Sequence, residues 1–208
     1  MGISIYVCII MITSLFAKEE KFEGYINQSQ WPRSIYAIGQ YENDLMTGSW
    51  SFYTDSTKTI KIAFGSFING NGSKISDTGI PYNGRDGEWK HYYSDTNSRN
   101  RRSLFTKNSI KAYQNWGNGK MDGQVITYYK DGKKSQVQHF QAGELNGIYD
   151  VWFENSNKYV EGYYSNNKPD SSWIRYYDTE GKKIYYQTEY KNGSVVKYSV
   201  LYEDGSPL

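Results

Sequence analysis

The stretch GELNGIYDVWFENSNKYVEGYY (Gly143–Tyr164) packs aromatic residues closely between three glycines and shows no helical spacing of its apolar positions. A second stretch just upstream, GNGKMDGQVITYYKDGKK (Gly117–Lys134), has the same order of residue types. In both, an aromatic anchor precedes two spaced glycines, a large apolar residue and an adjacent aromatic pair. The chain therefore contains a repeat, and the first stretch is one copy of it.

Six copies account for nearly all of the chain after about residue 36. The anchors at positions 116, 140, 164 and 190 follow one another at intervals of 24, 24 and 26 residues. A longer interval between Phe67 and Trp116 contains two insertions, at about residues 71–83 and 94–110. The six anchors are Tyr41, Phe67, Trp116, Phe140, Tyr164 and Tyr190.

Each copy is predicted to be a β-hairpin, because strand-forming residues alternate with Gly, Asp and Asn. The first strand ends at the anchor, the segment Gly119–Gly123 or its counterpart forms the turn, and the second strand ends at the aromatic pair. Gly39, Gly65 and Gly162 offer bare backbone that a ring on a neighbouring strand can cover. The chain is 17% aromatic, with 22 Tyr and 6 Trp. We therefore predict an all-β protein in which aromatic rings replace a conventional core.

The repeat, written Y/F-x-N-G-K-x-x-G-x-W-x-x-Y-Y-x-x-G-K, resembles the MORN repeat in the bacterial variant found in antitoxin-like proteins. The resemblance covers about residues 36–208, and it departs at Asn167 and Ser171, where the family has glycine. It implies an elongated, twisted antiparallel sheet of consecutive hairpins and a non-enzymatic role in binding proteins or lipids. Choline- or glucan-binding cell-wall repeats are a second, weaker resemblance.

The N-terminal segment 1–17 is uncharged and mostly apolar, and Lys18 ends it abruptly. Such a segment is typical of a secretory signal peptide, with an uncleaved anchor as the alternative. We treat residues 18–35 as an N-terminal extension of the array. The only cysteine, Cys8, lies in the apolar segment, so disulfides are not expected. These features favour export from a bacterium to the periplasm, cell surface or medium.

Composition and motifs predict no enzymatic activity, metal site or cofactor. The net charge is +2, which does not favour nucleic acid as a partner. His91 and His139 lack the neighbours of a metal site and are expected to be packing or surface residues. Asp86, Asp122 and Asp170 recur before Gly or Ser, which indicates turn residues rather than a catalytic pair.

Two surfaces are candidates for binding. The second insertion is basic and, if functional, would dock an anionic lipid or polymer or an acidic protein surface. Its cations are Arg99, Arg101, Arg102, Lys107 and Lys111. The other candidate is an aromatic sheet face formed by Trp50, Trp89, Tyr149, Trp152, Trp173 and Tyr177.

The sequence thus predicts an exported interaction module that binds a macromolecule, either an unknown protein or an anionic lipid or surface polymer. Two alternatives remain open. The chain could be an antitoxin or immunity-type protein that neutralises a partner toxin, or a repeat protein that binds cell-wall glycan or choline through its rings.

Segment 1–17 is expected to be absent from the mature protein, because an apolar segment that ends at a charged cluster is a substrate for signal peptidase. N-terminal sequencing of the protein from its native host tests this. A mature chain that still begins at Met1 would show that the segment is retained as an anchor.

Overall fold

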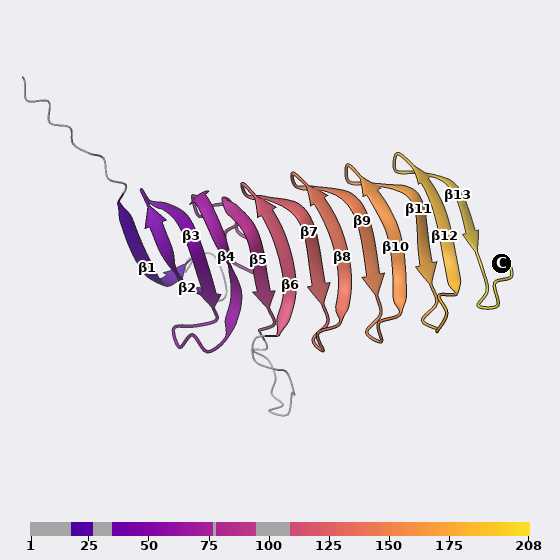
Figure 1. Ribbon diagram of the computed structural model, residues 1–208, viewed down its shortest axis with the longest axis horizontal. Coiled ribbons are helices and arrows are strands. Elements are labelled where there is room, and N and C mark those ends of the chain that lie inside the picture. The colour runs from indigo at the N-terminus through magenta and orange to yellow at the C-terminus, as the bar shows by residue number, and fades with distance from the viewer. Residues whose placement is uncertain (1–17, 27–34, 77, 95–108) are drawn as a thin grey trace, which may run out of the picture.

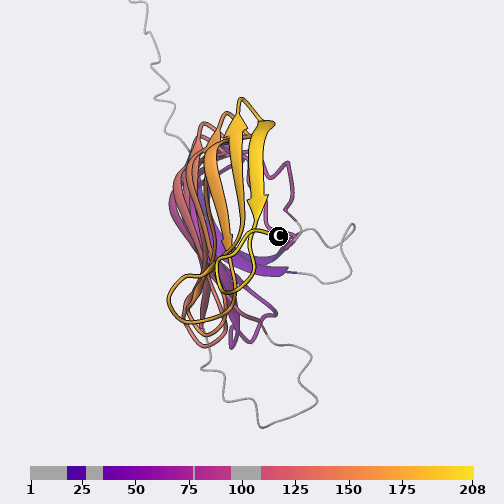
Figure 2. The same cartoon turned by 90° about the vertical axis from the view of Figure 1, so that its right-hand side faces the viewer.

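The computed structural model describes residues 18–26, 35–76, 78–94 and 109–208, and within them 13 strands form one sheet. The strands lie side by side in chain order, and each pairs antiparallel with the strands before and after it (Figure 1). Viewed along the row of strands, the sheet is a single twisted layer (Figure 2). The predicted all-β hairpin array is therefore confirmed.

The sheet begins in the segment that we had treated as an N-terminal extension. Strand β1 pairs with β2 over its full length, from Glu19 opposite Glu42 to Ile26 opposite Ile35. The strands of the first half are β1 (Glu19–Ile26), β2 (Ile35–Glu42), β3 (Leu45–Tyr53), β4 (Lys61–Gly70), β5 (Arg85–Tyr92) and β6 (Ile110–Gly117). The second half contains β7 (Lys120–Tyr128), β8 (Lys134–Gln141), β9 (Glu144–Trp152), β10 (Lys158–Ser165), β11 (Lys168–Tyr176), β12 (Ile184–Lys191) and β13 (Ser194–Val200).

No helix among the described residues is long and apolar enough to cross a membrane.

The turns inside the repeats are shorter than predicted. Asn118 and Gly119 alone connect β6 to β7, with φ angles of 50° and 75°, and Ala142 and Gly143 connect β8 to β9 in the same way. Two residues with positive φ form the primed turn that matches the twist of the flanking strands. Our placement of the whole segment Gly119–Gly123 in the turn was therefore wrong.

The second glycine of each copy instead forms a bulge inside the second strand. Gly123 and Gly147 have φ angles of 100° and 130°, and the pairing register shifts at both bulges. A Cβ atom at Gly147 would lie 2.8 Å from the Cβ atom of His139. Ser171 takes the equivalent place in β11 with a φ of 59°. The repeat therefore needs left-handed backbone here, which glycine adopts most easily.

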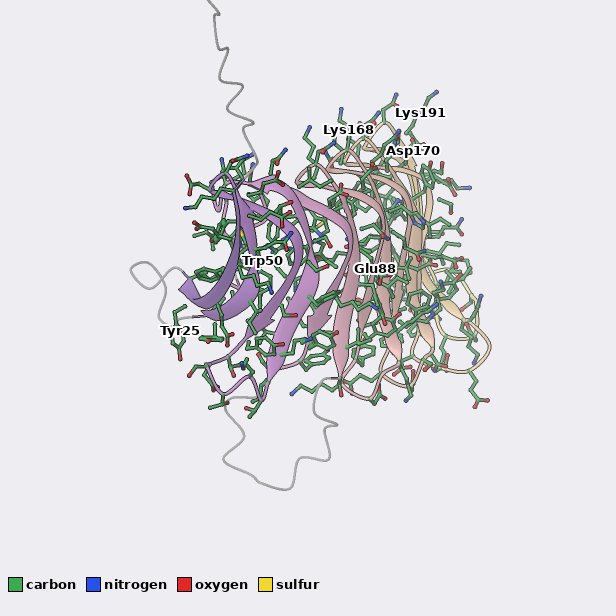
Figure 3. The ribbon with its side chains drawn as sticks, turned by 60° about the vertical axis from the view of Figure 1, so that its left-hand side comes forward. Tyr25, Trp50, Glu88, Lys168, Asp170 and Lys191 are labelled. Carbon is green, nitrogen blue, oxygen red and sulfur yellow. The ribbon has the colours of Figure 1, made fainter. Side chains whose placement is uncertain are left out.

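The aspartates of this bulge connect one hairpin to the next. The Oδ1 atom of Asp122 accepts a hydrogen bond from the backbone amide of Ala142, and that of Asp170 accepts one from Asn192, at 3.3 and 3.2 Å. Asp170 lies at the turn edge of the sheet beside Lys168 and Lys191 (Figure 3). The prediction that these carboxylates are turn residues was wrong, because Asp86, Asp122 and Asp170 lie within β5, β7 and β11. Each instead accepts a hydrogen bond from a backbone amide in the turn of the following hairpin.

Tryptophan rings cover glycines on one face of the sheet, as predicted for Gly39, Gly65 and Gly162. A Cβ atom at Gly39 would lie 2.1 Å from Cδ2 of Trp50. At Gly65 it would lie 2.2 Å from the same atom of Trp89. We call the side that carries Trp50, Trp89 and Trp173 the tryptophan face. An indole ring can lie flat on the neighbouring strand there only because the covered residue has no side chain.

Side-chain sizes are matched across the strands in the copies without this glycine. Gln114 occupies the covered position in β6 and pairs with Val125, while Gln138 in β8 pairs with Tyr149. Where glutamine replaces the covered glycine, the covering residue is therefore Val125 or Tyr149, each of which is smaller than tryptophan. The six anchors share the tryptophan face with these pairs, so the face carries a continuous row of apolar groups.

The first insertion closes the tryptophan face over β3 to β6. Ile80 is completely buried in the same apolar cluster as Trp50, Phe67 and Trp89. Arg85 anchors the insertion, because its side chain donates hydrogen bonds to the backbone oxygens of Pro81 and Ile80, at 2.8 and 3.2 Å. This half of the sheet consequently has a dry core.

Arg85 also lies between two indole rings. Its guanidinium carbon is 4.2 Å from the ring centre of Trp89 and 4.9 Å from that of Trp116. No acidic side chain in the described part of the chain forms an ion pair with it. Burial lowers the pKa of Arg85 to about 9, so the side chain remains a cation at neutral pH and the rings partly replace its lost hydration.

Gly65→Ala should destabilise the protein by about 3 kcal/mol, because the new methyl group must displace the buried ring of Trp89. Gly117→Ala is the matched control, since a Cβ atom there would lie 3.5 Å from Asp122, an ordinary contact. Urea denaturation of both variants measures the difference. Equal stability of the two variants would contradict the packing of rings on glycine.

Candidate functional site

The tryptophan face is open in the second half of the sheet, where it forms a groove. The connections β6–β7, β8–β9, β10–β11 and β12–β13 on one edge are two-residue turns, so no insertion crosses the face there. The groove has a volume of about 510 Å³ and runs across β7 to β12. Its lining residues include Gln136, Tyr149, Trp173, Arg175, Tyr186 and Thr188.

A cluster of rings forms the apolar wall of the groove. The ring of Trp173 lies 4.9 Å from Tyr164, 5.2 Å from Tyr149 and 6.2 Å from Tyr190, measured between ring centres. Its Nε1 atom donates a hydrogen bond to the backbone oxygen of Tyr163 at 2.9 Å, and its ring covers Gly162. These contacts fix the rings in place, so little side-chain entropy remains to be lost when a ligand packs on them.

Arg175 is the only charged residue that lines the groove. It lies two positions beyond Trp173 in β11, opposite Tyr186 and Val160, and its side chain is exposed. The guanidinium carbon is 5.7 Å from the ring centre of Tyr159. None of the described acidic residues forms an ion pair with Arg175. The groove therefore presents a free cation beside an aromatic wall.

Thr188 adds a buried hydroxyl group beside this cation. It lies opposite Trp173 on β12 and is only 1% exposed, yet it lines the groove. Its Oγ1 atom has no hydrogen-bond partner among the described residues. A buried hydroxyl without a partner lowers stability, so its presence in a groove indicates a position where a ligand could bond.

The structure does not bring the six predicted aromatic residues together on one accessible face. Tyr149 and Trp173 line the groove. Trp50 and Trp89 lie on the same face but are 0% exposed, so they belong to the core. Trp152 lies on the opposite face, where the ammonium group of Lys158 is 4.3 Å from its ring centre.

Tyr177, the last of the six, lies at the edge of the sheet and connects repeats. Its hydroxyl donates a hydrogen bond to the backbone oxygen of Leu201 at 2.9 Å. Tyr93 and Tyr129 make the same contact with Tyr128 and Trp152, at 2.6 and 2.5 Å. The second tyrosine of these three aromatic pairs is therefore a structural link between successive hairpins rather than part of a binding face.

Of the five predicted cations, only Lys111 falls within the part of the chain that the structure describes. It is exposed on β6, close to the end of the second insertion. Arg99, Arg101, Arg102 and Lys107 lie outside the described residues. The possibility that they dock an anionic partner remains a prediction from the sequence.

The opposite face carries an ionic cluster instead of a groove. The Nζ atom of Lys158 lies 2.9 Å from Asp150 and 4.0 Å from Glu161, whose carboxylate also accepts a hydrogen bond from Tyr176 at 2.6 Å. Burial and this carboxylate raise the pKa of Tyr176, so its hydroxyl remains protonated. Within the described ranges, no group of three or more His, Cys, Asp or Glu side chains could hold a metal ion.

The two edge strands differ in how well they resist pairing with another chain. β1 contains Glu19, Glu20, Lys21 and Glu23, and such charges discourage strand addition. β13 has one charged residue, and three of its large apolar side chains are more than half exposed: Val195, Val196 and Tyr198. β13 is the less protected edge.

His91 packs in the closed half of the sheet. Its ring lies 6.2 Å from that of Trp89, and Nε2 is 3.0 Å from Oε1 of Gln114. Burial, together with the nearby Arg85 cation, lowers the pKa of His91 to about 4. The interpretation of this histidine as a packing residue is confirmed.

A comparison of the chain with protein-family models and with curated proteins finds no match in either.

The polar residues of the groove were missed in the sequence, although one signal was present. In β11 the alternation of side chains places Arg175 on the same face as Trp173, and this could have been predicted. Thr188 occupies the position that Gly39 and Gly65 hold in other copies, but Gln114 and Gln138 also depart from glycine there, so the sequence did not single it out.

The stability of the protein should fall as the pH decreases from 6.5 to 4, because His91 takes up a proton near pH 6.5 when unfolded but only near pH 4 when folded. The stabilisation is fully present above pH 6.5, and its loss amounts to about 3 kcal/mol at pH 4. His91→Gln should flatten this dependence in urea titrations at several pH values. Equal slopes for the two proteins would contradict the buried, neutral state of His91.

Proposed function

We propose that this chain is a non-enzymatic binding module of the MORN-repeat type, exported by a bacterium, and that it holds a segment of a partner protein in the groove on its tryptophan face. The observation that carries the proposal is the contrast between the two halves of this face. The rings around Trp89 are closed by the insertion, whereas the equivalent rings around Trp173 are open and half-buried.

The composition of the groove supports a protein partner. Trp, Tyr and Arg are the residues that most often dominate the binding energy at protein interfaces. The groove combines Trp173 and Arg175 with several tyrosines, and the rings are already packed against one another. Ordered rings bind a partner with a smaller entropic cost than mobile side chains.

The same composition argues against two of the other partner classes. A choline group is a cation, and Arg175 in the groove would repel it. An anionic membrane surface or polymer is bound by several cations, whereas the groove offers one. A role as an antitoxin is compatible with the proposal, since a toxin would then be the protein in the groove.

Tyr186→Ala tests the proposal, because Tyr186 lines the groove while its only ring contact among the described residues is with the exposed Tyr198, at 6.3 Å. We expect a partner captured from the native host by the full chain to bind this variant at least about tenfold more weakly. Tyr163→Ala is the matched control, since Tyr163 is 41% exposed on the opposite face of the neighbouring hairpin.

Binding constants of the purified partner for both variants, with thermal melts to verify folding, provide the measurement. Equal affinities of the wild type and Tyr186→Ala would show that the groove is not the binding site. A larger loss for Tyr163→Ala would place the partner on the opposite face.

A further inference from the structure

We propose that Arg175 and Thr188 make the groove selective for an acidic polypeptide segment that places one carboxylate over β11 and β12. This inference rests on the proposed function and specifies the chemistry of the partner. The structure supplies three supports: a cation without a counter-ion, a buried hydroxyl without a partner, and a groove long enough for a continuous segment.

The first support is the charge balance of the groove. No aspartate or glutamate lines it, and the acidic pair Asp150 and Glu161 is bound to Lys158 on the opposite face. The ring of Tyr159 contacts the guanidinium of Arg175 but accepts none of the hydrogen bonds that a carboxylate would accept. An incoming carboxylate would therefore neutralise a cation that has no ion pair among the described residues.

The second support is the position of Thr188. Three copies with a covering tryptophan have glycine at the equivalent place, and there the ring lies directly on the backbone. The copies that lack this tryptophan have Gln114, Gln138 or Thr188 there. Thr188 instead introduces a buried hydroxyl, which costs stability when it is unpaired. The side chain of Gln114 at this place is hydrogen-bonded to His91 and Trp116, whereas the Thr188 hydroxyl has no partner among the described residues and is therefore available as a hydrogen-bond donor for a ligand.

The third support is the shape of the groove, which decides between kinds of acidic ligand. Its lining spans β7 to β12, or about 24 Å at the usual spacing between strands. About seven residues of extended polypeptide cover this length. A polyanion of the same length would carry several charges, and the single cation could neutralise only one of them. A mainly apolar segment with one acidic side chain matches both the length and the charge.

Three peptide libraries test the inference on the full chain. Each contains nine-residue peptides, acetylated and amidated at the ends, with a central Asp, Asn or Lys and randomised flanking positions. The library with central Asp should yield binders that lose affinity about tenfold or more when the Asp is replaced by Asn, as expected for a charge-assisted hydrogen bond. The library with central Lys should yield no peptides that compete with the Asp peptides for the protein.

Variants connect this preference to the two residues. Arg175→Gln should abolish the difference between Asp and Asn peptides, whereas Lys191→Gln should retain it. Lys191→Gln makes the same change in net charge at the turn edge of the sheet, away from the groove (Figure 3). Thr188→Val should weaken the Asp peptides and raise the Tm of the free protein by about 2–4 °C, because it removes the unpaired hydroxyl.

Several results would overturn the inference. One is equal binding of Asp and Asn peptides, and another is an Arg175→Gln variant that keeps the preference. A lack of binders in all three libraries, or binding of polygalacturonate in place of peptides, would also do so. The proposed function is tested separately, because Tyr186→Ala would still weaken capture of a partner that does not depend on a carboxylate.

Discussion

An indole ring lying on a glycine of the neighbouring strand is the contact on which this sheet depends. A single layer of strands has no second layer against which to bury apolar side chains, so its rings must lie flat on the sheet itself. Trp50, Trp89 and Trp173 do this over Gly39, Gly65 and Gly162, where even a methyl group would collide with the ring. Three of the six copies have this pairing, and the other three have Gln114, Gln138 or Thr188 in place of the glycine.

The same contact serves two purposes at the two ends of the molecule. In the first half, the insertion that ends at Arg85 covers the rings and converts them into a dry core. In the second half, two-residue turns leave no chain to cover them, and the rings around Trp173 form a groove. The length of one connection therefore decides whether a repeat contributes to stability or offers a surface to a partner.

Most of the fold could be predicted from the sequence, because it is set by local patterns. The anchors, the hairpins and the covered glycines all follow from spacing and alternation within about 25 residues. The accessibility of each ring could not be predicted in this way. Trp50 and Trp89 share the pattern of Trp173, but they are buried in one apolar cluster with Ile80 of the insertion, and Phe22 of β1 also packs against Trp50. Trp152 was misassigned because the alternation of side chains, which places Trp152 and Tyr149 on opposite faces, was not applied to this strand.

The most direct test of this account is the solvent accessibility of each tryptophan ring, measured by ¹⁹F NMR on protein labelled with fluorotryptophan and assigned with single Trp→Phe variants. We expect no H₂O–D₂O isotope shift for Trp50 and Trp89, which are 0% exposed, and a clear shift for the half-buried Trp173 in the groove. Equal shifts for Trp89 and Trp173 would contradict the division of one aromatic face into a closed core and an open groove.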